Sequence, residues 1–193
     1  MNITKKNIYV WCPFTSGVGT IKNVINSSFG LIKFSKSKLF EVSIINVFGE
    51  WDDYLDELKF KKIDTQNLNS VNFIKSWNKE GFLKSRFSYL LIFVTSFFSL
   101  FSILKKKKPD FLIIHLITSL PIILFSIFNF KTKLILHIAG HPKMTPLRKF
   151  IWKAASNKIT KIICPSEELR EYFLENRIFD YHKMIVVQDP RCS

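Results

Sequence analysis

Two histidines stand close together in the segment His137-Ile138-Ala139-Gly140-His141-Pro142. Near neutral pH an imidazole can act as a general base, orient a hydroxyl group or bind a phosphate. His137 ends an expected strand and His141 lies in the loop that follows, so both are candidate catalytic residues. We expect no metal site from these two histidines, because no third ligand accompanies them.

A glycine-containing turn, Ser16-Gly17-Val18-Gly19-Thr20, lies between the first expected strand and the first expected helix. Two glycines let backbone N–H groups approach a phosphate, and a helix N-terminus favours an anion. Ser16, Gly17, Gly19 and Thr20 are therefore candidates for binding an acceptor or a phosphate, and a plain tight turn is the alternative. The turn is not a P-loop, because no Gly-Lys-Ser/Thr follows. It is not the dinucleotide fingerprint, because Lys22 occupies the place of the third glycine.

Other polar residues have less specific surroundings. His115 falls inside an apolar run, which favours a satisfied core histidine. Lys143, Arg148, Lys149 and Lys153 surround the helix after the histidine loop. They indicate either a solvated face or docking to anionic lipid or a phosphorylated acceptor. Nucleic acid is not an expected partner, because aromatic residues are not interleaved with these bases in the way that stacks nucleotides.

The elements that must position these residues alternate along the chain. Apolar runs predict strands at 8–12, 42–48, 111–117, 134–138, 159–164 and 184–187, with helical patterns between most of them. Residues 50–77 have no clear pattern. Strands that are apolar on both faces are typical of a parallel sheet covered by helices on each side. We therefore predict an α/β fold, a Rossmann-like doubly wound parallel sheet of six strands.

Two of the expected helices have clear start signals. Thr145-Pro146 opens a helix that places Leu147, Phe150, Ile151, Ala154 and Ala155 on one face. Ser166 is the expected N-cap of the next helix, because Glu167 and Glu168 follow it in the first turn. These signals set where each helix begins relative to the strand before it.

Composition narrows the class of protein. Of 193 residues, 47% are hydrophobic and 23% are charged, which excludes a mainly disordered chain. The formal net charge of +14 suggests an anionic partner: nucleic acid, a membrane surface or a phosphate-bearing substrate. The three cysteines have no CxxC spacing. We therefore expect neither a disulfide framework nor a zinc site, and we expect the protein to lie in a reducing compartment.

Residues 87–104 form an uncharged stretch of 18 residues, followed by Lys105, Lys106, Lys107 and Lys108. Three interpretations stay open. The stretch is a helix buried in the α/β sandwich, an interfacial helix lying in a membrane surface, or a short transmembrane span. In the last two the four lysines would contact anionic lipid. No secretory signal peptide is apparent at the N-terminus.

The order of these segments resembles the N-terminal domain of GT-B glycosyltransferases, most closely glycosyltransferase family 4. The matching segments are Ser16 to Thr20, Lys108-Pro109-Asp110 with 111–115, Lys133 to Pro142, Ile162 to Glu167, and Lys183 to Pro190. The resemblance implies two Rossmann-like domains facing across a cleft. The N-terminal domain holds the acceptor, and His137 or His141 lies near the transferred sugar. It implies a nucleotide-sugar donor, a lipid-linked or saccharide acceptor, and no metal or other cofactor.

On this resemblance, residues 1–190 are the acceptor domain and 191–193 begin an interdomain linker, with the donor domain absent. We therefore expect a glycosyltransferase half that is inactive alone, acting in polysaccharide or glycolipid synthesis. We expect it to be cytoplasmic and peripheral on the inner face of the cell membrane. The alternatives are a membrane-associated subunit of a split enzyme, which would pair with a separate donor-domain chain, and a non-catalytic α/β protein that binds membrane surfaces.

Overall fold

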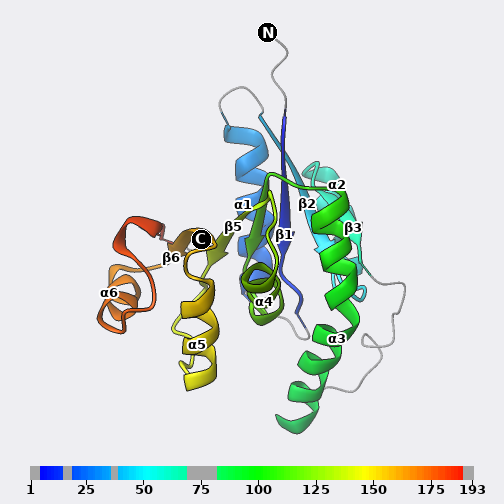
Figure 1. Cartoon of the computed structure of the whole chain (residues 1–193). Coiled ribbons are helices and arrows are strands. Elements are labelled where there is room, and N and C mark those ends of the chain that lie inside the picture. Colours follow the sequence, from blue (N-terminus) through cyan, green and yellow to red (C-terminus); the bar gives the residue numbers. More distant parts are fainter. Residues whose placement is uncertain (1–4, 15–18, 36–38, 69–81, 189–193) are drawn as a thin grey trace.

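A computed structural model describes residues 5–14, 19–35, 39–68 and 82–188 (Figure 1). Within them, the strands are β1 Lys6–Trp11, β2 Phe40–Asn46, β3 Asp64–Asn67, β4 Phe111–Ile114, β5 Lys133–His137, β6 Ile159–Cys164 and β7 Met184–Val186. The helices are α1 Thr20–Phe34, α2 Leu55–Phe60, α3 Phe82–Lys106, α4 Ser119–Ile127, α5 Pro146–Ala155 and α6 Glu167–Glu175. Short 3₁₀ turns cover Asp52–Tyr54 and Tyr181–Lys183.

The seven strands of the described chain form one parallel sheet in the order β3-β2-β1-β4-β5-β6-β7. The strand order reverses between β1 and β4, as in a doubly wound Rossmann-like sheet. The predicted α/β fold class is therefore confirmed, and the predicted count of six strands is wrong. The additional strand is β3, an edge strand of four polar residues that carries no apolar pattern.

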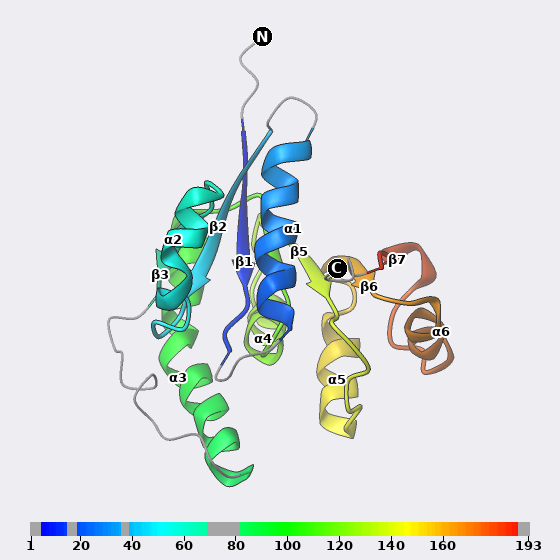
Figure 2. The ribbon, with the colours of Figure 1, turned by 180° about the vertical axis from the view of Figure 1, so that it is seen from behind.

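Helices cover both faces of the sheet. On one face α1 and α2 pack over β1 and β2, around Ile25, Ile44 and Leu58 (Figure 2). On the other face α3, α4, α5 and α6 enclose a larger core, which includes Leu112 and Leu136. Successive residues of each strand contribute to opposite faces, because side chains alternate along a strand. The near-continuous apolar runs of β1 and β2 follow from this double coverage, whereas β5, β6 and β7 contribute buried residues to the larger core only.

The long apolar segment forms most of α3. Its inner side packs against the sheet through Ile92, Ser96, Leu100 and Leu104, so a helix buried on one side is what the structure shows. Its outer side exposes a stripe of three apolar side chains: Leu90, Val94 and Phe98. Among the described residues, no helix combines the length and the apolar character needed to cross a membrane. The interfacial interpretation stays a prediction.

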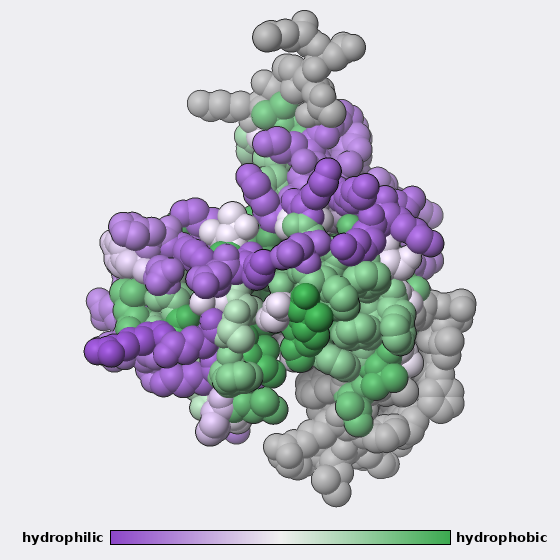
Figure 3. All heavy atoms as spheres, in the orientation of Figure 1, coloured by the Kyte–Doolittle hydropathy of each residue, from purple (hydrophilic) through white to green (hydrophobic). Residues whose placement is uncertain are grey.

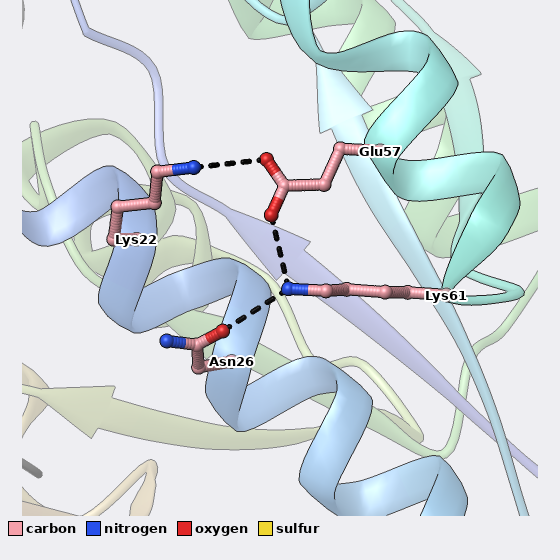
Figure 4. Close-up of polar contacts among 4 residues, drawn as sticks. All are labelled: Lys22, Asn26, Glu57 and Lys61. Carbon is pink, nitrogen blue, oxygen red and sulfur yellow. Dashed lines mark hydrogen bonds and ion pairs between the residues drawn. The ribbon is translucent and has the colours of Figure 1, made fainter.

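A polar network ties α2 to α1 (Figure 4). Lys22 and Lys61 each donate to one oxygen of the Glu57 carboxylate at 3.0 Å, and Lys61 also donates to Asn26 Oδ1 at 3.1 Å. The hydrogen bonds that Lys61 and Lys22 donate to Glu57 lower the pKa of this carboxyl group, and the one from Lys61 has the larger effect. Lys22, which stands where a dinucleotide fingerprint has its third glycine, is thus engaged with α2.

The predicted helix starts at Thr145 and Ser166 are confirmed. Thr145 Oγ1 accepts a hydrogen bond from the Arg148 amide at 3.2 Å, and Ser166 Oγ accepts one from the Leu169 amide at 3.3 Å. Each satisfies a backbone donor that the first helical turn leaves free. Both caps fix α5 and α6 directly after the loops that follow β5 and β6.

The side of α5 that carries Leu147, Phe150 and Ala154 does not pack against the sheet. All three side chains are exposed, whereas Trp152 and Ala155 are buried. Trp152 contacts the rings of Phe173 and Phe179, with centroids 5.9 and 5.6 Å away. The predicted face is therefore divided: Ala155 is buried and Ile151 packs partly against the core, whereas Leu147, Phe150 and Ala154 face solvent.

Candidate functional site

A cavity of about 630 Å³ opens at the carboxyl edge of the sheet. It lies beyond the ends of β1, β4 and β5 and against the first turns of α4 and α5. The residues that line it come from four segments: Pro13 and Phe14; 115–119; 136–142; and Thr145, Leu147, Arg148, Ile151 and Trp152. Among the described lining residues none is acidic, and two helix N-termini point to this edge. The cavity therefore suits an uncharged or anionic ligand.

His115 and His137 meet at the floor of this cavity. Their ring centroids are 4.4 Å apart, and the side chains are 5% and 7% exposed. Burial, and then the charge that His137 carries when protonated, hold the pKa of His115 well below its ordinary value. Nδ1 of His115 is buried and has no hydrogen-bond partner among the described protein atoms. Two adjacent imidazoles of this kind hold at most one proton between them near neutral pH.

The sequence favoured a core role for His115. The prediction that it is buried is confirmed, but it also lines the cavity beside His137. A signal for this existed in the sequence, because His115 and His137 each follow an apolar run that ends at the same sheet edge. A buried ring with a free nitrogen at a cavity wall is positioned to bond to a ligand.

His141 lies at the rim of the same cavity. Its side chain is 53% exposed, its Nε2 is 3.8 Å from Glu168 Oε1, and its ring centroid is 5.8 Å from that of Tyr172. Arg148, at the start of α5, also lines the cavity, and its guanidinium donates to the Lys143 carbonyl at 2.7 Å. The structure thus brings the two sequence-predicted histidines to one cavity, with His137 at the floor and His141 at the mouth.

Backbone strain marks the loop between β4 and α4. Ile117, which lines the cavity, has φ of 47°, a conformation that β-branched residues rarely adopt. The Trp11 indole donates to the Ile117 carbonyl at 3.2 Å and helps to hold the loop in place. Strained residues of this kind concentrate at binding and catalytic sites, so the strain supports a functional role for this edge.

The described part of the glycine turn, Gly19 and Thr20, begins α1 at the same sheet edge. Ser16 and Gly17 lie outside the described residues. Gly19 is the N-cap of α1 with φ of −56°, and a Cβ added there would meet no atom within 4 Å. Neither Gly19 nor Thr20, the first residue of α1, lines the cavity. Nothing inside the described protein therefore requires a glycine at position 19.

A buried carboxyl group at the end of β2 was not anticipated from the sequence. Both Glu50 side-chain oxygens accept from the Val47 amide at 3.0 Å, and one also accepts from the Phe48 amide at 2.9 Å. Burial raises the pKa of Glu50 to about 7. Gly49 completes this tight loop with φ of 92°, a conformation that favours glycine. Glu50 therefore acts as an internal cap for the loop.

The four lysines predicted to contact a membrane lie far from this cavity. Lys105 and Lys106 end α3, and Lys107 and Lys108 lead into the start of β4. They are exposed at the amino edge of the sheet, whereas the cavity lies at the carboxyl edge. Lys105 there contacts the Asn129 carbonyl at 3.3 Å and the ring of Phe130. The lysine run and the candidate site therefore face opposite ends of the molecule.

The described cysteines do not contribute chemistry. Cys12 and Cys164 are buried and free, and burial raises their pKa values to about 12 and about 11. Both thiols are therefore protonated near pH 7 and poor nucleophiles. In the described part of the chain no group of three His, Cys, Asp or Glu side chains could hold a metal ion.

Solved structures with a similar fold come from sugar metabolism. A glycosyltransferase from Rickettsia africae matches with a TM-score of 0.57 at 19% identity, over 95% of this chain and 43% of its own. The lipopolysaccharide outer core galactosyltransferase WaaB matches with a TM-score of 0.58 at 12% identity, over 96% of this chain and 46% of the WaaB chain. A UDP-GlcNAc 2-epimerase from Neisseria meningitidis matches with a TM-score of 0.59 at 14% identity, over 95% of this chain and 47% of the epimerase chain. That structure was solved with UDP-GlcNAc bound.

The chain has the fold of one half of a GT-B enzyme. It spans less than half the length of these three structures. No model of a known protein family matches the sequence. No curated protein matches it either. The similarity at these identities shows the fold, and the chemistry has to be argued from the site.

Proposed function

We propose that this chain is the acceptor-binding half of a glycosyltransferase. In this proposal a sugar passes from a nucleotide-sugar to an acceptor held in the cavity at the carboxyl edge of the sheet. The observation that carries the proposal is the buried pair His115 and His137 at the floor of that cavity, in the half-fold of a GT-B enzyme. Open α/β sheets bind ligands at this edge.

The cavity has the groups that sugar-hydroxyl recognition needs. A neutral imidazole can accept a proton from an acceptor hydroxyl group, and His137 at the cavity floor is assigned that part. Arg148 and the first turn of α5 would stabilise a phosphate on a lipid-linked acceptor. The apolar wall, which includes Phe14 and Trp152, gives a sugar face a surface to pack on. His141 at the mouth is assigned to contact the sugar that is transferred.

The remaining parts of the reaction come from elsewhere in this proposal. Residues 1–190 form the acceptor domain, and a donor domain, on the same or a separate chain, supplies the nucleotide-sugar site and completes the cleft. Ser16, Gly17, Gly19 and Thr20 would face that cleft and approach the acceptor or a phosphate. The described chain alone would therefore bind an acceptor without turning over a nucleotide-sugar, and no metal is invoked.

The same proposal extends to the setting of the enzyme. The acceptor would be membrane-associated, as in polysaccharide or glycolipid synthesis by family 4 enzymes. The chain would be peripheral on the cytoplasmic face of the cell membrane. The charge of +14 supports attraction to an anionic surface. The exposed apolar side chains of α3 and α5 also support contact with lipid.

Ligand titration of the isotope-labelled chain tests this function. Amide NMR spectra are recorded with simple saccharides, phosphorylated saccharides and UDP-, GDP- and TDP-sugars. We expect saccharides and their phosphates to shift signals of 115–119 and 136–142. His137→Ala should weaken binding by at least about tenfold, equivalent to about 1.4 kcal/mol. Lys33→Ala, in the separate groove between α1 and β2, serves as the control and should leave binding unchanged.

Two results would reject the proposal. One is binding of nucleotide-sugars, but not of saccharides or their phosphates, at the His115 and His137 cavity. The other is sugar transfer by the 193-residue chain alone when it is supplied with nucleotide-sugars and a lipid extract. Binding to membranes without any saccharide binding would instead favour the non-catalytic α/β membrane-binding protein.

A further inference from the structure

The first turns of α5 present an apolar pair to solvent. Leu147 is 68% exposed and Phe150 is 72% exposed. They are three positions apart, so they lie on the same side of the helix. Lys143, Arg148 and Lys153 are exposed around them. We call these five residues the α5 rim. An exposed apolar pair within a ring of cations is typical of a helix that lies on an anionic membrane.

The charge of the surrounding chain points to an anionic partner. Between Asp110 and Glu167 the sequence contains eight lysine or arginine residues and no acidic residue. A protein surface that met this face would have to supply many acidic groups at an otherwise apolar contact. An anionic bilayer supplies both features, because its headgroups attract the cations and its acyl region accepts the apolar side chains.

The α5 rim also borders the candidate site. Leu147 and Arg148 line the cavity mouth, and α5 begins at the carboxyl edge of the sheet. The N-terminal half of α3 reaches beyond the same edge (Figure 1). The exposed Leu90, Val94 and Phe98 also lie on α3. Figure 3 shows hydrophobic surface gathered toward this end of the molecule and hydrophilic surface toward the other. The cavity thus opens on the apolar side.

We propose that the α5 rim docks onto an anionic lipid bilayer and brings the cavity mouth to the membrane surface. This inference rests on the proposed membrane-associated acceptor, and it replaces the lysine run as the main contact. The sheet between the two edges is four to six residues deep, about 13–20 Å at ~3.3 Å per residue. That depth exceeds the Debye length of about 8 Å at physiological salt, so Lys105 to Lys108 would contribute little to binding in this orientation.

Vesicle flotation of the purified chain tests the docking face. Vesicles of phosphatidylcholine alone are compared with vesicles that also contain phosphatidylglycerol. The test variant is Leu147→Ser/Phe150→Ser. The matched control is Phe34→Ser/Phe60→Ser, whose side chains are equally exposed, at 74% and 86%, but lie on α1 and α2. A third variant replaces all four of Lys105 to Lys108 with serine.

We expect the wild type to bind the anionic vesicles, and to bind more weakly at high salt. The α5 double variant should bind at least about tenfold more weakly, whereas the control and the lysine variant should change by less than about twofold. Thermal unfolding monitored by circular dichroism confirms that each variant is folded, as expected for substitutions of exposed residues.

The proposal is overturned if the wild type binds neither kind of vesicle, or if the lysine variant loses as much binding as the α5 variant. It is also overturned if the wild type self-associates in solution and Leu147→Ser/Phe150→Ser abolishes that association, because the face would then be a protein interface. The readout is vesicle binding and not sugar recognition. A failure here is therefore distinguishable from a failure of the saccharide titration.

Discussion

Replacing Glu50 with glutamine is expected to remove a pH dependence of stability that originates in one buried carboxyl group. Burial raises the pKa of Glu50 from its ordinary value of 4.5 to about 7, even though backbone amides of the loop bond to the carboxylate. The folded protein therefore binds this proton more tightly than the unfolded chain does. The stability that the protonated form confers is complete below about pH 4.5 and is lost as the pH rises through about 7.

The size of the effect follows from the difference between the two pKa values. Each pKa unit corresponds to about 1.4 kcal/mol, so the full loss is about 3 kcal/mol for a side chain that is 6% exposed. Glutamine does not titrate. The free energy of unfolding of the wild type minus that of Glu50→Gln should therefore fall by about 3 kcal/mol between about pH 4.5 and about pH 8. The other titrating groups, His115 included, occur in both proteins and cancel in this difference.

Urea denaturation followed by circular dichroism across this pH range measures the difference. Glu57→Gln is the matched control, because the bonds from Lys61 and Lys22 lower the pKa of Glu57. The stability that ionised Glu57 contributes is complete above about pH 4.5 and is lost only as the pH falls further. The difference in the free energy of unfolding between the wild type and Glu57→Gln should therefore be constant from about pH 5 to about pH 8. Parallel curves for the wild type and Glu50→Gln at every pH would refute the claim that this carboxyl group is desolvated.

Three further outcomes are expected from the structure. The pKa of His115 lies well below 6.5, so the free energy of unfolding should fall as the pH drops below about 6.5. His115→Phe should flatten that fall in urea titrations. If the variant keeps the same dependence of stability on pH, the burial of His115 is contradicted. Thr145→Ala and Ser166→Ala should each lower the free energy of unfolding by about 1 kcal/mol in the same assay, because each removes the side chain that caps a helix N-terminus. Unchanged stability would contradict the capping role of these side chains. Cys12 and Cys164 should resist iodoacetamide near pH 8 until urea unfolds the chain, as read by mass spectrometry; rapid labelling of the folded protein would show that the thiols are accessible.

The strands that carry the core were predictable, and the edge strand was not. The run Ile159–Cys164 matches β6 residue for residue, and the other predicted strands differ from β1, β2, β4, β5 and β7 by a few residues at their ends. β1 and β2 are apolar because helices cover the sheet on both faces there, whereas β5, β6 and β7 contribute buried residues to one core only. β3 is Asp-Thr-Gln-Asn, pairs with one neighbour only and has no buried residue. It forms through backbone hydrogen bonds, which leave no hydrophobic pattern to read.

The orientation of α5 shows another limit of periodicity. The spacing of Leu147, Phe150 and Ile151 correctly indicates an amphipathic helix, but it does not say which neighbour each side meets. Trp152 packs among rings that are contributed by α6 and the segment after it, and this long-range contact sets the rotation of the helix. Leu147 and Phe150 are consequently exposed, although the buried Ala155 belongs to the same predicted face.

The meeting of His115 and His137 joins the order of the strands to the chemistry of the site. The register pairs Ile114 of β4 with Leu136 of β5, and the two histidines are the residues that come next in each strand direction. Neighbouring parallel strands therefore place both rings side by side, which neither apolar run indicates by itself. A second positive charge at 4.4 Å would be strongly disfavoured, so at least one ring stays neutral near pH 7. A neutral imidazole at the floor of a cavity free of acidic lining residues, within the described chain, is suited to receive the proton of a hydroxyl group rather than to pair with a phosphate.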